Sequence, residues 1–116
     1  MRKLIKSVHD AFSGLATVFR EERNYKIEVA IGVIVLVFAL VYRFSYLEIA
    51  LLVFACSLVI TGEIINTTIE DLCDKVEPNI DPAIGKIKDM MASFVLVSSI
   101  CSVIIGILVF LSHFLS

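Results

Sequence analysis

Three carboxylates and one amide recur at helical spacing in the middle of the sequence. Glu63, Asn66, Glu70 and Asp74 are separated by three, four and four residues, so on an α-helix they share one face while the isoleucines between them point elsewhere. Like charges one turn apart destabilise a helix unless a cation or a proton relieves the repulsion. Carboxylates with few neutral partners suit Mg²⁺, which keeps several waters and binds through one or two carboxylates plus phosphate oxygens. The stripe therefore predicts a divalent-metal site.

The alternative is that these side chains form the solvated, charged end of a helix that leaves a bilayer. We adopt that reading for Asp71 and Glu77, which lie outside the stripe. Glu63, Asn66 and Glu70 are embedded among isoleucines. For these three we expect a functional role, because acidic groups beside an apolar layer are expensive to keep there.

The composition indicates that the elements carrying this stripe lie in a membrane. Of the 116 residues, 59% are hydrophobic and 19% are charged, the net charge is -2, and the mean hydropathy is +0.95. These values exclude a small soluble enzyme, a disordered chain and a protein that binds nucleic acid through bulk positive charge. Three scattered cysteines also exclude a disulfide scaffold. The remaining class is a small integral-membrane protein.

Three runs without formal charge, Val29–Tyr42, Ile49–Gly62 and Met90–Ser112, predict three transmembrane helices, because a bilayer core about 30 Å thick needs roughly 20 apolar residues. Allowing for flanking residues, we expect spans at about 26–43, 47–66 and 90–112. Each of the first two runs covers only about 21 Å of helix at 1.5 Å per residue. Their flanking carboxylates must therefore lie at the membrane boundary or inside an assembly.

An amphipathic helix is predicted at about 3–22, ahead of the first span. At 100° per residue, the apolar side chains of this segment gather on one side and the charged and hydroxyl side chains on the other. Such a helix lies flat in the membrane interface, or packs its apolar stripe on neighbouring membrane helices. Both readings stay open from the sequence.

Local signals set the remaining boundaries of one all-α domain over residues 1–116. We expect the second long helix to continue to about Val76, because Pro78 disfavours helical geometry at Glu77. Asp81 and Pro82 then fit the N-cap and first position of the helix that becomes the third span. Of the ten lysines and arginines, all but Arg43 fall on one side of this arrangement. The positive-inside rule thus predicts that the amino terminus and the loop before the third span are cytoplasmic.

The stripe also resembles a family signature. The run Glu63-Ile-Ile-Asn66-Thr-Thr-Ile-Glu70, followed by Asp74, closely resembles the motif of the bacterial integral-membrane diacylglycerol kinase and undecaprenol kinase family. The segments Glu22-Arg23-Asn24 and Gly85-Lys86-Ile87-Lys88-Asp89 agree with it. The resemblance covers almost the whole chain, with its length, surface helix, three spans and loop position.

The resemblance implies a lipid kinase in which ATP phosphorylates the hydroxyl of a lipid dissolved in the bacterial cytoplasmic membrane. It assigns Glu63 as the general base at the membrane boundary, Glu22 and Glu70 as ligands of Mg²⁺, and Asn66 and Lys88 as holders of the terminal phosphates. Phosphoryl transfer needs positioning, charge neutralisation and a proton acceptor, and this inventory provides all three. The chain contains no phosphate-binding loop and no catalytic loop of the soluble kinases.

Three further positions match the family with less defined roles. Asp74 would organise the nucleotide or the metal, and Asp89 ends the third motif. Glu28 matches another polar position, and an anchor at the level of the lipid headgroups is its alternative role. The loop from Glu77 to Pro82 carries no basic residue, so the sequence assigns no adenine or ribose contacts.

Undecaprenol is the expected acceptor, because the Glu22-Arg23-Asn24 and Asn66-Thr67-Thr68 forms are closer to the undecaprenol-phosphorylating branch. Diacylglycerol is the alternative. Three spans and one surface helix cannot enclose both ATP and a lipid hydroxyl, so we expect a homo-oligomer with sites between protomers, and the family suggests a trimer. No nucleic-acid partner is expected.

Two hypotheses of other classes compete with the kinase. A small multidrug or cation transporter predicts a fourth span and a carboxylate near the middle of a helix, and a non-catalytic adaptor needs no aligned polar stripe. His9 and His113 have no partner near them in the sequence and are expected on opposite sides of the membrane, which argues against a shared metal site. Gly32, Gly106 and the serines of the third span are typical of close helix packing.

Overall fold

The computed structural model describes residues 1–116 and is entirely helical. Its four helices are α1 (Arg2–Glu21), α2 (Arg23–Val41), α3 (Tyr46–Val76) and α4 (Pro82–Leu115). The last three are long and apolar enough to cross a membrane. The prediction of an all-α membrane protein with three spanning helices is therefore confirmed at the level of the fold.

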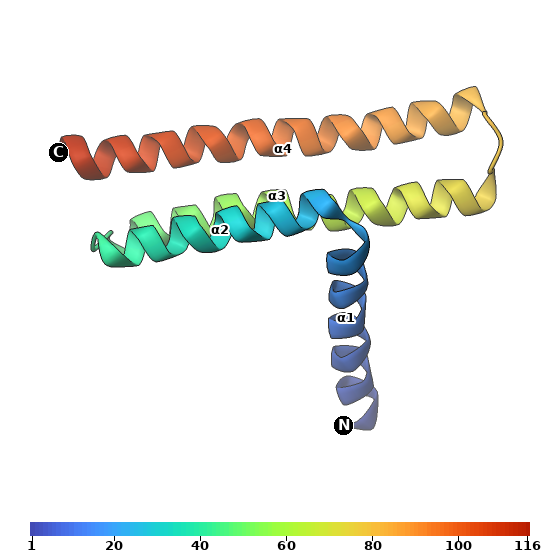
Figure 1. The fold of residues 1–116 in the computed structure, drawn as a ribbon, viewed down its shortest axis with the longest axis horizontal. Helices are drawn as coiled ribbons and strands as arrows, with labels where there is room; N and C mark the ends of the chain where they lie inside the picture. Colours follow the sequence, from blue (N-terminus) through green and yellow to red (C-terminus); the bar gives the residue numbers. More distant parts are fainter.

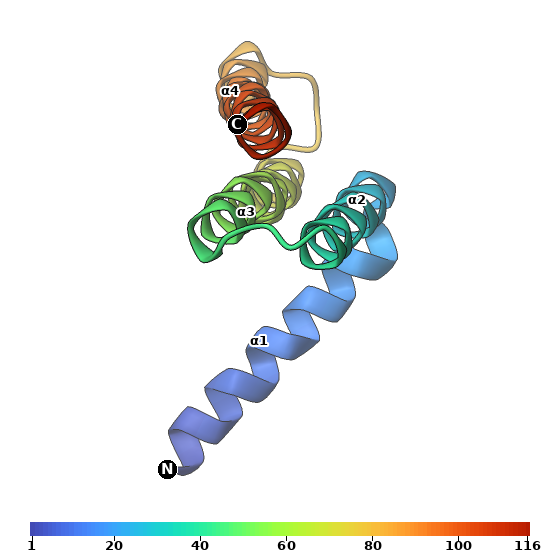
Figure 2. The same cartoon turned by 90° about the vertical axis from the view of Figure 1, so that its left-hand side faces the viewer.

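The three long helices run side by side, and α1 crosses their direction (Figure 1). Seen from the end, α3 lies between α2 and α4, while α1 extends away from the start of α2 (Figure 2). The predicted spans at 47–66 and 90–112 are parts of longer helices, since α3 and α4 both continue beyond the apolar region. These continuations carry most of the candidate site residues.

The turn between α2 and α3 is short and is fixed by local hydrogen bonds. α2 ends at Val41, two residues before the predicted end of the span at 43, and Arg43 adopts a left-handed conformation with φ 57°. The backbone N–H of Phe44 donates to the carbonyl of Ala39. Ser45 and Glu48 then form a capping box at the start of α3.

The helix boundaries expected on either side of the loop between α3 and α4 are present. α3 continues through Glu63 to Val76, and Glu77 is extended ahead of Pro78. The Asp81 side chain accepts hydrogen bonds from the backbone N–H groups of Ala83 and Ile84 at 2.8 and 3.2 Å. Pro82 takes the first helical position of α4, where a missing N–H costs nothing.

Little of the chain is buried by its own packing. Only 12 of 116 residues are buried, and the core cluster of Ala39, Phe44, Leu52 and Val109 lies near the α2–α3 turn. Aromatic rings of Phe38, Phe110 and Phe114 surround it. Most large apolar side chains of α2, α3 and α4 are exposed, so lipid or further copies of the chain must cover them.

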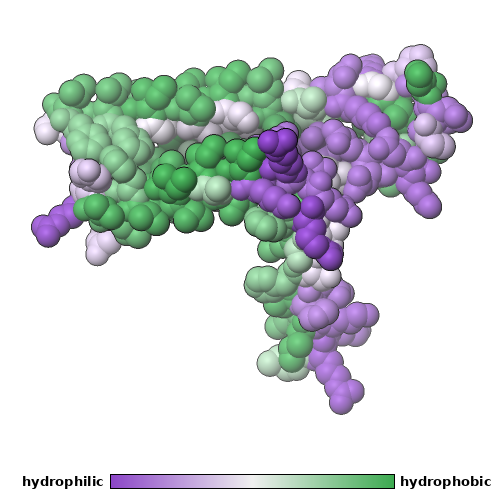
Figure 3. All heavy atoms as spheres, viewed as in Figure 1, coloured by the Kyte–Doolittle hydropathy of each residue, from purple (hydrophilic) through white to green (hydrophobic).

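No residue of α1 is buried, so the long helices of the same chain leave most of its apolar stripe uncovered. α1 is joined to α2 by an edge-to-face contact between Phe19 and Tyr25, with ring centroids 6.3 Å apart, and by Lys26 above the Phe19 ring. In Figure 3 the apolar side of α1 is on the left, where the apolar parts of the long helices also lie. Its polar side is on the right, where the charged ends of α3 and α4 lie.

Candidate active site

The junction between α1 and α2 brings Glu22 into the site. Glu22 is the only residue between the two helices and has an extended backbone with φ -108° and ψ 111°. Its backbone N–H donates to the carbonyl of Val18, which ends α1 and lets the chain turn into α2. The Glu22 carboxylate interacts electrostatically with Glu63 of α3. The sequence motif at the junction and the motif on α3 therefore belong to one site.

Glu63 is the most buried acid of the site. It is 8% exposed, and the residue before it, Gly62, lies against the ring of Phe94, where an added Cβ would be 3.4 Å from a ring carbon. The close approach of α4 thus covers the side of α3 next to Glu63.

Glu28 of α2 lies close enough to Glu63 for the two carboxyl groups to interact. Its Oε2 atom is buried and has no hydrogen-bond partner. Two carboxyl groups that face each other at the edge of the apolar region form an acceptor-rich site for a hydroxyl donor. This contact favours a role for Glu28 in the site over the role of a separate headgroup anchor.

Asn66 and Glu70 form a pair one turn further along α3. The Asn66 Nδ2 atom donates to Glu70 Oε1 at 3.3 Å, and the Asn66 Oδ1 atom is buried without a partner. A free amide oxygen beside a carboxylate is the oxygen donor set that Mg²⁺ prefers. Within one chain no three acidic, histidine or cysteine side chains converge on one point, so waters and phosphate oxygens would complete a coordination sphere at this pair. The residues present fit Mg²⁺ in that form.

Lys88 connects α4 to the stripe on α3. Its Nζ atom lies 2.5 Å from Asp74 Oδ1 and also interacts with the charge of Glu70. Lys88 precedes the apolar part of α4, and its hydrogen bond to Asp74 raises the pKa of the ammonium above the usual value of a lysine. The lysine is thereby held as a cation beside the Asn66–Glu70 pair.

The structure thus groups Glu22, Glu28 and Glu63 on one side, with Asn66, Glu70, Asp74 and Lys88 following along α3 and α4. Asp89 is exposed and takes part in none of these contacts. Asp71 lies on a different side of α3 and lines a hollow of about 390 Å³ between α1 and α3. Glu77 accepts a hydrogen bond from the backbone of Asn79, as expected for a residue at a helix end.

His113 has no partner near it in the sequence, and the structure gives it two partners from distant parts of the chain. Its Nδ1 atom lies 3.1 Å from Glu48 Oε1 and its Nε2 atom lies 3.2 Å from the carbonyl oxygen of Tyr42. The ring stacks on Phe44 with centroids 3.9 Å apart. This cluster joins all three long helices at the end opposite to the carboxylates. Sixty-five residues separate His113 from Glu48, so only the packing of α4 on α3 reveals the pair.

Comparison with known proteins decides the family. The sequence profile described as "Prokaryotic diacylglycerol kinase" matches residues 9–110, which include every candidate residue above. The chain belongs to the prokaryotic diacylglycerol kinase family. It is therefore an integral-membrane kinase of a family that phosphorylates lipid alcohols, and the transporter and adaptor hypotheses are not retained.

Two relatives of this kinase carry different names. The chain is 31% identical over 104 residues to the "Diacylglycerol kinase" of Synechocystis sp., a match that covers 89% of this chain and 59% of the relative. It is 29% identical over 111 residues to the "Undecaprenol kinase" of Bacillus subtilis, which covers 96% of this chain and 90% of the relative. The first relative is thus considerably longer than this kinase. Family membership fixes the class of acceptor and leaves the particular lipid open.

Proposed function

We propose that this kinase transfers the terminal phosphoryl group of ATP to the hydroxyl of a membrane polyprenol, with undecaprenol as the acceptor and diacylglycerol as the alternative. The observation that carries the proposal is the position of Glu63. It is buried beside Glu28 where the apolar part of α3 meets the polar part, and it lies in electrostatic range of Glu22 and Glu70. A lipid hydroxyl and a phosphate can therefore meet there from opposite sides.

In the proposed reaction, the acceptor oxygen forms a bond to the terminal phosphorus while the bond from that phosphorus to the bridging oxygen of ADP breaks. The Glu63 carboxylate takes the hydroxyl proton. Lys88, oriented by Asp74, neutralises charge on the transferred group. Glu22, Glu70 and the free Asn66 oxygen would hold Mg²⁺, which supplies further charge neutralisation on the phosphate oxygens when bound.

Undecaprenol is favoured over diacylglycerol by two observations. The forms Glu22-Arg23-Asn24 and Asn66-Thr67-Thr68 resemble the undecaprenol-phosphorylating branch. The match to the undecaprenol kinase of Bacillus subtilis also extends over nearly the full length of both chains.

We further infer a homotrimer in the bacterial cytoplasmic membrane, with the amino terminus and the active site on the cytoplasmic side. The sparse burial of the single chain supports sites shared between protomers. The clustering of lysine and arginine on one side of the spans supports the orientation. The crossing direction of α1 (Figure 1) supports its location in the membrane interface.

The test is phosphorylation by the purified full chain in lipid vesicles, with labelled ATP, Mg²⁺ and undecaprenol, diacylglycerol or no acceptor. We expect labelled undecaprenyl phosphate to form faster than phosphatidic acid, and no label without an acceptor. The Glu63→Gln variant is the matched control for contaminating kinases. Failure to label either lipid with an assembled protein would refute the proposed function, while faster labelling of diacylglycerol would select the alternative acceptor.

A further inference from the structure

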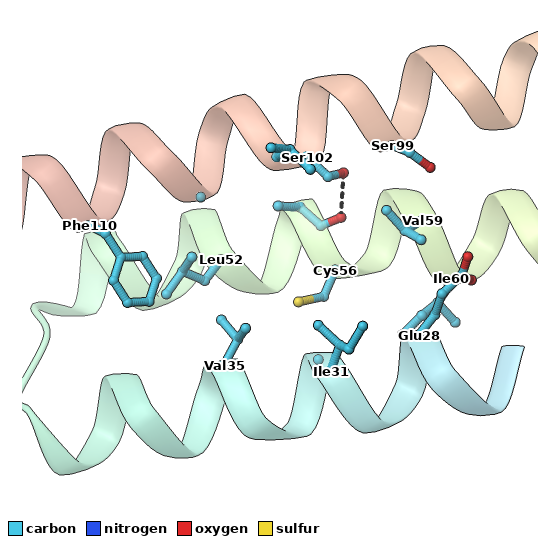
Figure 4. Close-up of a pocket in the computed structure, with 14 residues that line it drawn as sticks. Glu28, Ile31, Val35, Leu52, Cys56, Val59, Ile60, Ser99, Ser102 and Phe110 are labelled. Carbon is cyan, nitrogen blue, oxygen red and sulfur yellow. Dashed lines mark hydrogen bonds between the residues drawn. The ribbon is translucent and has the colours of Figure 1, made fainter. Parts of the chain in front are cut away.

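A groove runs along the apolar parts of α2, α3 and α4, away from the carboxylates. Its volume is about 420 Å³. Figure 4 shows Glu28 towards one end, Phe110 towards the other, and Ile31, Cys56 and Val35 between them. Apart from Glu28, the lining consists of aliphatic, aromatic, glycine, cysteine and serine residues. The groove is therefore an apolar channel with a single ionisable group near one end.

That ionisable group connects the groove to the proposed active site. Glu28 lines the groove and also faces Glu63. Its buried Oε2 atom lacks a hydrogen-bond donor, and a buried acceptor without a donor costs free energy. A hydroxyl at the head of an apolar chain would donate to this oxygen and lie beside Glu63 at the same time.

We propose that this groove seats the isoprene units next to the hydroxyl of the acceptor, and that its single apolar channel selects a single-chain polyprenol. The inference rests on the proposed function and adds to it the part of the chain that recognises the lipid. One channel accommodates one linear chain, whereas diacylglycerol carries two chains from one headgroup. The polyprenol chain follows the groove toward Phe110, and its hydroxyl remains at Glu28 and Glu63.

Gly106 keeps the far part of the groove open. It lines the groove, and a Cβ added there would have no heavy atom within 4 Å. The expectation that Gly106 supports close helix packing therefore fails within this chain. Gly32, by contrast, lies opposite Cys56 at an ordinary packing distance of 3.6 Å. Seven residues of α4 separate Gly106 from Ser99, so it lies about 10 Å deeper along the groove.

The hydroxyl of Ser102 lines the groove, but it is already hydrogen-bonded within the chain and does not offer a second polar site to the lipid hydroxyl. Its oxygen lies 2.8 Å from the carbonyl oxygens of both Ala55 and Ser98, which share its single proton, and the contact with Ala55 is drawn in Figure 4. The serine is thus already satisfied and fixes α4 against α3.

The experiment compares wild type with Gly106→Leu, which fills the groove, and Cys101→Leu, which enlarges a residue on the exposed side of α4 outside the groove. Lipid phosphorylation is measured in vesicles over a range of undecaprenol concentrations. We expect Gly106→Leu to raise the KM for undecaprenol about tenfold with little change in kcat, as for a change of a few carbon atoms in an apolar pocket. Cys101→Leu should leave both constants near those of wild type.

Oligomer size is measured on the same preparations, because a neighbouring helix is the competing occupant of the groove. If Gly106→Leu alters the oligomer, or lowers kcat and leaves the KM unchanged, the groove does not seat the lipid. An unchanged KM in an intact oligomer would overturn the inference while the proposed function still stands. A wild type that phosphorylates no lipid would instead refute the proposed function.

A second measurement does not depend on a folded variant or on turnover. Wild-type protein in vesicles is irradiated with a polyprenol that carries a diazirine in one of the isoprene units near its hydroxyl, and the labelled peptides are identified by mass spectrometry. We expect labels on the part of α4 from Val103 to Phe110 and on α2 near Val35, and competition by unlabelled undecaprenol. Labels confined to other surfaces would overturn the inference.

Discussion

Glu63 combines burial with a position at the edge of the apolar region, and this combination predicts its mutant behaviour. Glu63→Gln keeps the shape of the side chain and removes the proton acceptor, so kcat for lipid phosphorylation should fall by about 10² to 10⁴ while ATP binding is retained. Glu63→Asp should recover little, because a retreat on the order of 1 Å spoils the reacting geometry. Turnover and ATP affinity are measured on the same intact oligomer.

A structural role for Glu63 predicts a different result. If the carboxyl group only stabilises the contact with Glu28, the Gln variant should lose oligomer stability before it loses turnover. Near-normal kcat in an intact Glu63→Gln oligomer would exclude the residue as the base.

The two expected metal ligands predict a changed magnesium requirement. Glu70 lies beside the free Asn66 oxygen, and Glu22 approaches from the helix junction. Glu22→Gln and Glu70→Gln each remove one anionic ligand, so each should raise the concentration of Mg²⁺ or ATP needed for half-maximal rate and lower turnover about tenfold or more. Asp71→Asn, on another side of α3, is the matched control. An ordinary Mg²⁺ titration in both glutamine variants would contradict the assignment.

Lys88 forms an ion pair with Asp74, and this contact predicts that the effects of substituting the two residues are coupled. Lys88→Met should raise the KM for ATP and lower kcat about tenfold or more, since it removes the cation beside the phosphate site. Asp74→Asn should show a smaller effect, and in Lys88→Met the loss of Asp74 should add little, because the two residues form one unit. Lys75→Met, an exposed lysine of α3, is the control. Additive effects of the two substitutions would contradict a shared role.

At the scale of the helices, one histidine joins the ends of α2, α3 and α4 that lie opposite to the carboxylates. His113 contacts Glu48 of α3 and the end of α2 and stacks on Phe44. His113→Leu keeps an apolar contact with Phe44 and loses both polar contacts, so we expect thermal unfolding in detergent at a temperature lower by about 5 °C. His9→Leu, on exposed α1, should leave it unchanged. Equal unfolding temperatures for all three proteins would show that the cluster contributes nothing to stability.

The helix boundaries could be predicted because their signals are local. Asp81 and Pro82 start α4 through contacts within four residues, and Pro78 acts on its neighbour Glu77. The stripe on α3 follows from helical periodicity alone. The contact between Glu28 and Glu63 and the His113 cluster could not be predicted, since each depends on how one helix is aligned along another. Periodicity gives the face of a helix and says nothing of its axial register against a neighbour.

At the scale of the whole molecule, the exposed apolar surface of the single chain favours an assembly. A closed ring would cover part of the surface that the single chain leaves exposed. Chemical cross-linking of a kinase-active preparation should therefore give a trimer as the largest abundant species. Mixing Glu63→Gln protomers with Lys88→Met protomers should restore some activity if each site draws residues from two chains. A preparation that is fully active yet cross-links only as monomer would contradict both expectations.

The continuity of α3 also predicts that the enzyme is sensitive to the thickness of the bilayer. The helix runs without interruption from the cap at Ser45 to Glu63 and beyond, a rise of about 27 Å over those residues, and the hydrocarbon core of a bilayer is about 30 Å thick. Near the start of α3, Glu48 contacts His113 of α4. A straight helix of fixed length that is held near Ser45 at one membrane surface sets the depth of the Glu63 carboxylate at the other surface. If Glu63 is the base, a thicker bilayer should draw its carboxylate below the reach of the nucleotide, and a thinner one should move it out of the layer that dissolves the lipid. The rate of lipid phosphorylation should then depend on the thickness of the bilayer.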